Sequence, residues 1–146
     1  MSLPDSRFSA GIFSLRIKQN KAMEQQTPVV YGIANCDTVK KARAWLAQRG
    51  LAHRFVDFKK TPPTPELLTV WMAQLDWDIL LNRQGTTWRK LSPAQQAAVV
   101  DAKSAAALML AQASVIKRPV IHWSGAWPAK PVFSVGFKPE QWPVPP

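Results

Sequence analysis

The chain has 146 residues, of which 47% are apolar, and a formal net charge of +10; such a chain usually forms one globular domain with its own core. Its single cysteine and two histidines exclude a disulfide framework and a closed zinc site within one chain. No apolar run approaches the roughly 20 residues of a membrane span, and the scattered basic residues form no recognisable nucleic-acid motif.

Residues 1–27 differ in composition from the rest of the chain. Basic residues alternate there with serine and isolated apolar residues, and acidic residues are scarce. Transit peptides have such a composition, but we favour a basic, flexible extension or an artefact of the assigned start, with Met23 as the true first residue.

The first regular elements are predicted directly after this segment. Val29 to Ile33 is an apolar run typical of a buried strand, and Asp37 to Arg49 has apolar residues at helical spacing. Gly50 follows as a typical helix stop. Arg54 to Phe58 alternates like a second strand. A strand, helix and strand at this spacing predict a right-handed unit with parallel strands.

A helical segment is predicted next, over about 64–114. Helices should begin after Thr64 and after Ser92, because each residue is a good N-cap followed by a proline at the first helical position. A further helix is expected from Ala105 to Gln112.

Two short strands are predicted near the C-terminus. They span Arg118 to Trp123 and Lys130 to Val135, with Ser124-Gly125 in the connection, and they make a plausible hairpin. A short segment near Pro139 to Trp142 ends the domain. The sequence therefore predicts an α/β domain in which helices cover a mixed sheet.

Three segments resemble a known family. They are residues 31–42 around Cys36, residues 80–91 with Gly-Thr-Thr-Trp, and residues 116–120 with Arg-Pro. Together they resemble the ArsC/Spx/YffB family, and most closely its YffB branch of glutathione-dependent thiol reductases. The resemblance implies a single thioredoxin-like domain over 28–146, with a mixed four-stranded sheet formed by β-α-β, a helical insertion, β-β and a short C-terminal helix.

Cys36 is the predicted nucleophile. It stands where the first helix begins, and the unpaired N–H groups of a helix start favour a thiolate. Lys40 would also favour the anion if it reaches back toward the sulfur. Asn35 and Thr38 are candidates for hydrogen bonds to the thiolate or to a bound substrate.

The family resemblance implies further site residues. It places Arg118 beside the thiol, where a guanidinium stabilises the thiolate and holds an anionic substrate, and it makes the bond to Pro119 cis. The family usually has an arginine directly before Gly-Thr-Thr-Trp, but this chain has Gln84 there. Arg83 and Arg89 are therefore the candidates for substrate or glutathione binding from the insertion.

The lone cysteine limits the mechanism. Attack by Cys36 gives a mixed disulfide or another covalent adduct that a second thiol must resolve. Glutathione is the expected co-substrate in a cytoplasmic protein, and no permanently bound cofactor or metal is expected. We predict a glutathione-dependent thiol/disulfide reductase whose substrate is a thiol, a disulfide or an oxyanion, with glutaredoxin as a further candidate partner. Lys138 is expected to be a solvated charge.

Two alternatives stay open. One is an arsenate reductase that draws electrons from glutathione or glutaredoxin, although Gln84 weakens the cationic cradle that an oxyanion needs. The other is a non-enzymatic, Spx-like regulator that binds RNA polymerase. Regulators of that type generally sense redox state through a Cys-x-x-Cys pair, and Val39 stands where its second cysteine would be.

Overall fold

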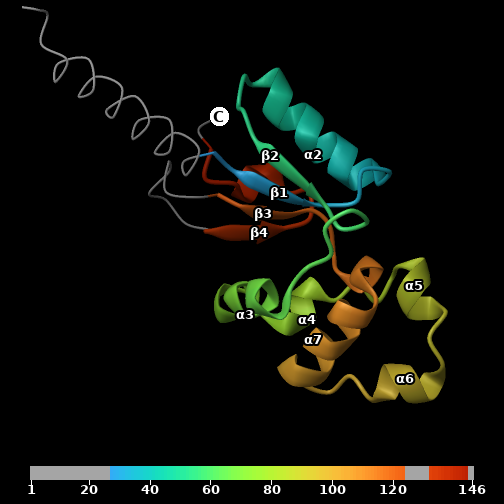
Figure 1. Ribbon diagram of the computed structural model, residues 1–146. Helices are drawn as coiled ribbons and strands as arrows, with labels where there is room; N and C mark the ends of the chain where they lie inside the picture. The colour runs from blue at the N-terminus through green and yellow to red at the C-terminus, as the bar shows by residue number, and fades with distance from the viewer. Residues whose placement is uncertain (1–26, 124–131, 145–146) are drawn as a thin grey trace, which may run out of the picture.

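A mixed four-stranded sheet forms the centre of the protein. The computed structural model describes residues 27–123 and 132–144. Its strands are β1 (Val29–Gly32), β2 (Arg54–Asp57), β3 (Val120–His122) and β4 (Phe133–Val135). They lie in the order β2-β1-β3-β4 (Figure 1), with β1 parallel to β2 and antiparallel to β3, and with β3 antiparallel to β4. The predicted thioredoxin-like mixed sheet is confirmed.

Some predictions fall outside the described residues. They are the character of residues 1–26, the Ser124-Gly125 connection and the start of the last strand at Lys130.

Helix α2 (Asp37–Gln48) covers one face of the sheet (Figure 1). It ends where the sequence predicts, because Gly50 adopts a left-handed φ of 67° that other residues disfavour. The Leu51 N–H donates to the Leu46 carbonyl at 2.9 Å and the Gly50 N–H donates to the Ala47 carbonyl at 3.0 Å. These two bonds form a Schellman motif, which closes the helix and turns the chain toward β2.

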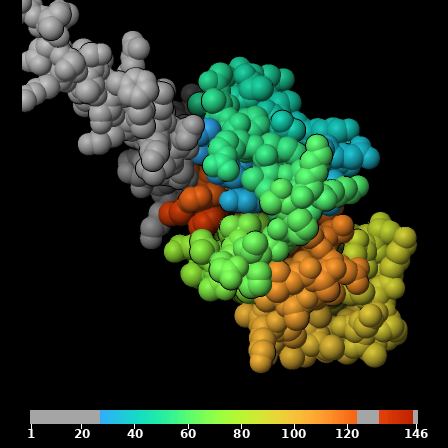
Figure 2. All heavy atoms as spheres, viewed as in Figure 1, coloured from blue at the N-terminus to red at the C-terminus, as the bar shows by residue number. Residues whose placement is uncertain are grey.

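The insertion covers the other side of the sheet and lies directly against it (Figures 1 and 2). Both predicted helix starts are correct: the Thr64 hydroxyl accepts from the Leu67 N–H, and Ser92 and Gln95 form a capping box. The elements of the insertion are α3 (Pro65–Gln74), α4 (Trp77–Leu80), α5 (Thr86–Arg89), α6 (Pro93–Ala97), α7 (Ala102–Ala111) and the 3-10 turn η1 (Ala113–Val115).

Helix α7 begins at Ala102 rather than at Ala105, because Asp101 and Ser104 form a second capping box at its start. A 3-10 turn, η2 (Pro139–Gln141), stands where the short C-terminal helix was predicted. No helix in residues 27–123 or 132–144 is long and apolar enough to cross a membrane.

The insertion is tied by hydrogen bonds to the segment that leads into β3. The Asn82 N–H donates to the Val115 carbonyl at 2.8 Å, and the Lys117 N–H donates to the Leu80 carbonyl at 2.7 Å. Between them, Leu81 and Ile116 form an isolated antiparallel bridge. The loop after α4 is thereby fixed beside the residues that precede β3.

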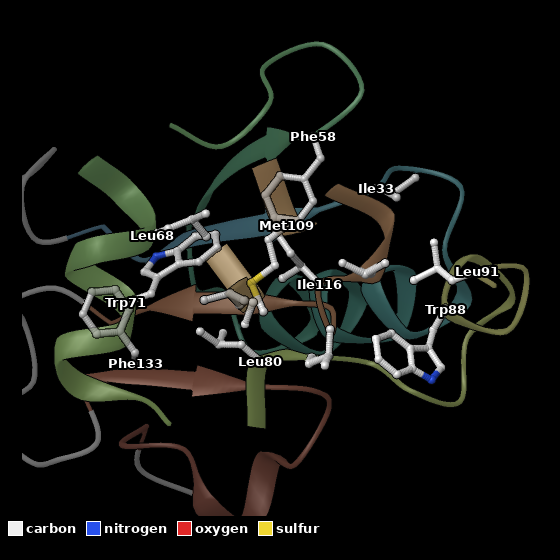
Figure 3. Close-up of a cluster of buried hydrophobic side chains, with 14 residues drawn as sticks. Ile33, Phe58, Leu68, Trp71, Leu80, Trp88, Leu91, Met109, Ile116 and Phe133 are labelled. Atoms are coloured by element: carbon white, nitrogen blue, oxygen red, sulfur yellow. The ribbon is translucent and has the colours of Figure 1, made fainter. Parts of the chain in front are cut away.

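The alternation of side chains along the strands divides the core into two clusters. On β3, Val120 faces the insertion, while Ile121 faces α2. The larger cluster joins the sheet to the insertion and includes the buried Trp71 and Met109 (Figure 3). The α2 side holds the second cluster, which includes Trp123. The start of α2 and the start of β3 are therefore both anchored in packed core.

Gly32, the last residue of β1, allows α2 to begin close to the sheet. A Cβ atom at this position would lie 2.7 Å from Cγ2 of the fully buried Val39. Because that side chain has no free space into which to move, Gly32→Ala should destabilise the fold by about 1–3 kcal/mol. Denaturant unfolding would measure the loss.

The double variant Gly32→Ala/Val39→Ala is the control for this prediction. It removes the methyl groups that meet the new Cβ. The losses of unfolding free energy in the two single variants, Gly32→Ala and Val39→Ala, should therefore sum to more than the loss in the double variant. Strict additivity would show that the cost of Gly32→Ala arises elsewhere.

Candidate active site

A cleft of about 360 Å³ lies at the end of the sheet where α2 begins. Its walls come from segments that are far apart in the sequence: the start of α2, the loop between α4 and α5, the residues before β3, and the residues after β4. The lining residues are Cys36, Thr38, Asn82, Gln84, Gly85, Lys117, Arg118, Val135, Gly136, Phe137 and Lys138. The only cysteine of the chain therefore opens into a shared pocket.

Cys36 occupies the N-cap position of α2. Its backbone is extended, with φ of −121° and ψ of 124°, and its carbonyl accepts the first helical hydrogen bond from the Lys40 N–H at 2.9 Å. This geometry leaves the N–H groups of the first helical turn free to face the sulfur. The side chain is half-buried, so it is shielded in part but still open to a reactant in the cleft.

Arg118 supplies the second functional group of the cleft. Its Nη1 donates to the Ser114 carbonyl at 2.8 Å and, more weakly, to the Ile116 carbonyl at 3.4 Å. Its Nε is buried and has no hydrogen-bond partner among the described residues. The guanidinium is thus held by η1 while one of its donors remains unused. Such a donor favours an anion beside it.

The pKa of the Cys36 thiol is lowered from its ordinary value. Burial acts in the opposite direction and raises the pKa, but other interactions outweigh it. The backbone N–H of Val39 contributes most to the lowering, followed by the hydrogen bond and charge of Arg118 and by the backbone N–H of Thr38. The thiolate is the nucleophilic form of cysteine, so the site favours attack on an electrophilic sulfur or oxyanion centre.

The remaining cleft residues make the pocket cationic. Lys117 and Lys138 join Arg118 in the lining, and no acidic side chain belongs to it in the described part of the chain. Gln84 stands in the lining on the insertion side, so the cleft has a neutral amide there. The loop that carries it is ordered by Asn82, whose Oδ1 accepts from the Gln84 N–H at 3.1 Å. A pocket of this charge suits an anionic reactant.

The structure brings three of the predicted site residues, Cys36, Thr38 and Arg118, together in the lining of the cleft. The Arg118–Pro119 bond is cis, as the family resemblance implies. The Pro119 carbonyl accepts from the Gly136 N–H at 2.9 Å. Pro119 therefore joins the segment before β3 to the segment after β4, although it does not line the cleft itself.

Neither insertion arginine lines the cleft. Arg83 forms an ion pair with Asp78 and places its guanidinium 5.8 Å from the Trp77 ring centroid. Arg89 folds back within the insertion, where its Nε donates to the Gln84 carbonyl at 3.0 Å. Arg83 is held on the outside of the insertion. The Arg89 side chain fixes the cleft loop by binding the backbone carbonyl of Gln84.

Asn35 and Lys40 also stand outside the cleft lining. Both are exposed, and the Lys40 Nζ donates to the Asn35 Oδ1 at 3.5 Å. The lysine bonds to Asn35 on the exposed side of the helix start and does not reach back to the sulfur, which was the condition for its predicted effect on the thiolate. Lys138, which we expected to be a solvated charge, is exposed but lines the cleft.

Three residues that were not predicted as site residues also line the cleft: Lys117, Asn82 and Phe137. Two of them stand inside the segments that carry the family resemblance: Lys117 directly precedes Arg118, and Asn82 follows Leu80-Leu81. Their position in those segments was the available signal. For Phe137 the sequence holds no comparable signal, because its place depends on how the chain leaves β4.

Known proteins resemble this chain over most of its length. A model of the ArsC family matches residues 31–144. An uncharacterized protein of Haemophilus influenzae is 40% identical over 96 residues, which make up 66% of this chain and 83% of that protein.

Two solved structures extend the comparison. The structure of a YffB protein is 47% identical, has a TM-score of 0.70, and matches 78% of this chain and 94% of its own. An arsenate reductase (ArsC) related protein from Brucella melitensis is 45% identical, with a TM-score of 0.61, over 79% of this chain and 90% of its own. The family match spans the cysteine, the insertion and the Arg-Pro segment that together form the cleft, and the chain belongs to the ArsC family.

Proposed function

We propose that the protein is a glutathione-dependent thiol/disulfide reductase that acts through Cys36. The observation that carries this proposal is the half-buried thiol with a lowered pKa in a cleft lined by three cationic residues, Arg118, Lys117 and Lys138. Glutathione carries two carboxylates, and these cations complement them. Membership of the ArsC family supports an oxidoreductase of this general type.

The chemistry proceeds through one covalent intermediate. The Cys36 thiolate attacks one sulfur of a disulfide, so a new S–S bond forms and the other sulfur leaves as a thiolate. The chain has no second cysteine to displace the bound group. A glutathione thiolate therefore attacks the mixed disulfide, releases the Cys36 thiolate and leaves as a disulfide with the bound group.

Arg118 and the helix start have separate tasks in this cycle. The Val39 and Thr38 N–H groups hold negative charge on the sulfur before attack and after release. Arg118 lies close enough to stabilise the same charge, and because it lines the cleft its guanidinium can also hold an anionic group that arrives with the substrate. The reaction needs no proton transfer by a protein group, since thiolates serve as both nucleophile and leaving group.

Intact mass after incubation with oxidised glutathione tests the proposal. The wild-type chain should gain one glutathionyl group, and added reduced glutathione should remove it, because Cys36 is both reactive and unpaired. Cys36→Ser should gain nothing under the same conditions. A wild-type protein that stays unmodified at pH 7.5 over the time in which free cysteine reacts would contradict the proposal.

Arsenate reduction is the second candidate, because one solved relative at 45% identity is named as related to arsenate reductase. A tetrahedral oxyanion would accept hydrogen bonds from Arg118 and lie near Lys117 and Lys138. The neutral Gln84 provides only an amide on the insertion side of the cleft. Arsenate-dependent oxidation of glutathione that disappears in Cys36→Ser would favour this candidate.

A further inference from the structure

A second pocket adjoins the active-site cleft along the edge of the sheet. It has a volume of about 230 Å³ and lies between β4, the segment after β4, and the insertion. We call it the edge groove. Its walls include the apolar side chains of Leu75, Ile79, Phe133 and Trp142, and it shares Val135 and Lys138 with the cleft that holds Cys36. The groove therefore continues the active site.

Strand β4 is the outer strand of the sheet on this side, next to α3 and α4 (Figure 1). Its inner edge pairs with β3: Ser134 lies opposite Ile121, the Trp123 N–H donates to the Val132 carbonyl at 2.8 Å, and the Gly136 N–H donates to the Pro119 carbonyl at 2.9 Å.

Hydrogen-bonding direction alternates along an antiparallel strand. Since Val132, Ser134 and Gly136 face β3, the backbone N–H and C=O groups of Phe133 and Val135 point to the outer edge. No residue in the described part of the chain bonds to these outward groups. An open strand edge of this kind is a template for another extended segment.

We propose that the edge groove binds an extended polypeptide segment of the disulfide substrate, so that the preferred substrate is a protein disulfide and not a small one. The segment pairs with the outward groups of Phe133 and Val135 and places an apolar side chain against Leu75 and Ile79. This mode of recognition obtains affinity from the main chain and specificity from a side-chain pocket.

The edge groove and the active-site cleft are continuous, which favours an extended polypeptide segment as the bound group. Cys36 follows β1, and β1, β3 and β4 are aligned at this end, because Tyr31 lies opposite Val120, which lies opposite Val135. A chain that lies along β4 therefore leads directly to the cleft, where its own disulfide meets the Cys36 sulfur. Free glutathione, a small polar tripeptide, needs only the cationic cleft and does not use the apolar wall around Ile79.

The proposal rests on the thiol/disulfide reductase function proposed above and specifies its substrate. For a protein cysteine joined to glutathione, Cys36 attacks the glutathione sulfur, and the protein leaves as a thiolate. Cys36 then carries glutathione, and a second glutathione thiolate attacks that bond, which yields oxidised glutathione and the free Cys36 thiolate. Glutathione is the only reductant that this cycle needs.

The test compares two substrates in three proteins. One substrate is a glutathionylated peptide with leucine and valine around its cysteine; the other is the mixed disulfide of glutathione and 2-mercaptoethanol. The proteins are the wild type, Ile79→Asp and Val70→Asp. Ile79 and Val70 are both 51% exposed, but only Ile79 lines the groove. The measured quantity is the ratio of kcat/KM for the peptide to kcat/KM for the small disulfide.

We expect the ratio to fall about tenfold in Ile79→Asp, because a carboxylate replaces part of the apolar wall, and to stay at the wild-type value in Val70→Asp. An unchanged ratio in Ile79→Asp overturns the inference while the reductase function stands. If the ratio is unchanged and the melting temperature falls more in Ile79→Asp than in Val70→Asp, a segment of the chain itself covers the groove, and the inference is overturned in the same way. If the wild type turns over neither substrate, the proposed function fails, and the inference fails with it.

Discussion

Cys36→Ser is expected to lower the turnover of a mixed disulfide by glutathione by a factor on the order of 10³ or more, since removing a covalent nucleophile has effects of at least this size. A serine hydroxyl is not ionised near neutral pH and cannot form the disulfide that glutathione resolves. The chain contains no second thiol that could replace it. The measurement is kcat/KM with glutathione as the reductant.

The fold of Cys36→Ser serves as the control. The sulfur is half-buried and belongs to the margin of the larger core cluster, so the isosteric hydroxyl should leave the melting temperature within a few degrees of the wild type. A folded Cys36→Ser protein that retained a tenth of the activity would assign catalysis to another group.

Arg118→Gln is expected to raise the pKa of the Cys36 thiol, because it removes an opposite charge and a hydrogen bond that favour the thiolate. At a pH below both pKa values, the variant therefore holds a smaller fraction of thiolate. Alkylation by iodoacetamide between pH 6 and 7 should slow, by a factor on the order of ten. At a pH above both pKa values the thiol is ionised in both proteins, and the rates should converge. The full pH profile of alkylation measures this.

Two further variants show whether the slower alkylation of Arg118→Gln depends on where the lost charge stands. Lys40→Gln removes a cation from the same end of α2 but outside the cleft, and it should leave the profile unchanged. Arg118→Lys keeps the charge and loses the planar fork that reaches the Ser114 carbonyl, so its profile should lie between those of the wild type and Arg118→Gln. Equal shifts in Lys40→Gln and Arg118→Gln would point to general electrostatics.

The elements that sequence analysis located best are those with a local start or stop signal. Thr64 and Ser92 begin helices through side-chain bonds to residues three positions ahead, and Gly50 ends one through its left-handed backbone. Helices α4 and α5 have only four residues each, which is too short for helical periodicity to appear. Their formation depends on packing, with Leu80 and Trp88 buried in the core.

The candidate site was predictable where a residue stands next to a fixed element, and less so elsewhere. Cys36 follows from its place at the helix start, and Arg118 follows from the resemblance of the Arg-Pro segment to that of the ArsC family. The position of Arg83 could not be predicted, because it depends on contacts that form only in the folded insertion. There the Asp78 carboxylate and the Trp77 and Trp88 rings hold its guanidinium outside the cleft. Lys138 entered the cleft because Gly136, with its left-handed φ of 82°, turns the chain after β4.

The reactivity of Cys36 depends on segments that meet only in the folded chain. The amides that stabilise the thiolate are in place only when α2 is formed, and Arg118 stands beside the sulfur only when β3 is paired with β1. Before that stage Cys36 is an ordinary thiol, mostly protonated at neutral pH. The thiol therefore acquires its reactivity together with the native structure, and the alkylation rate at pH 6 reports the fraction of molecules that have completed their fold.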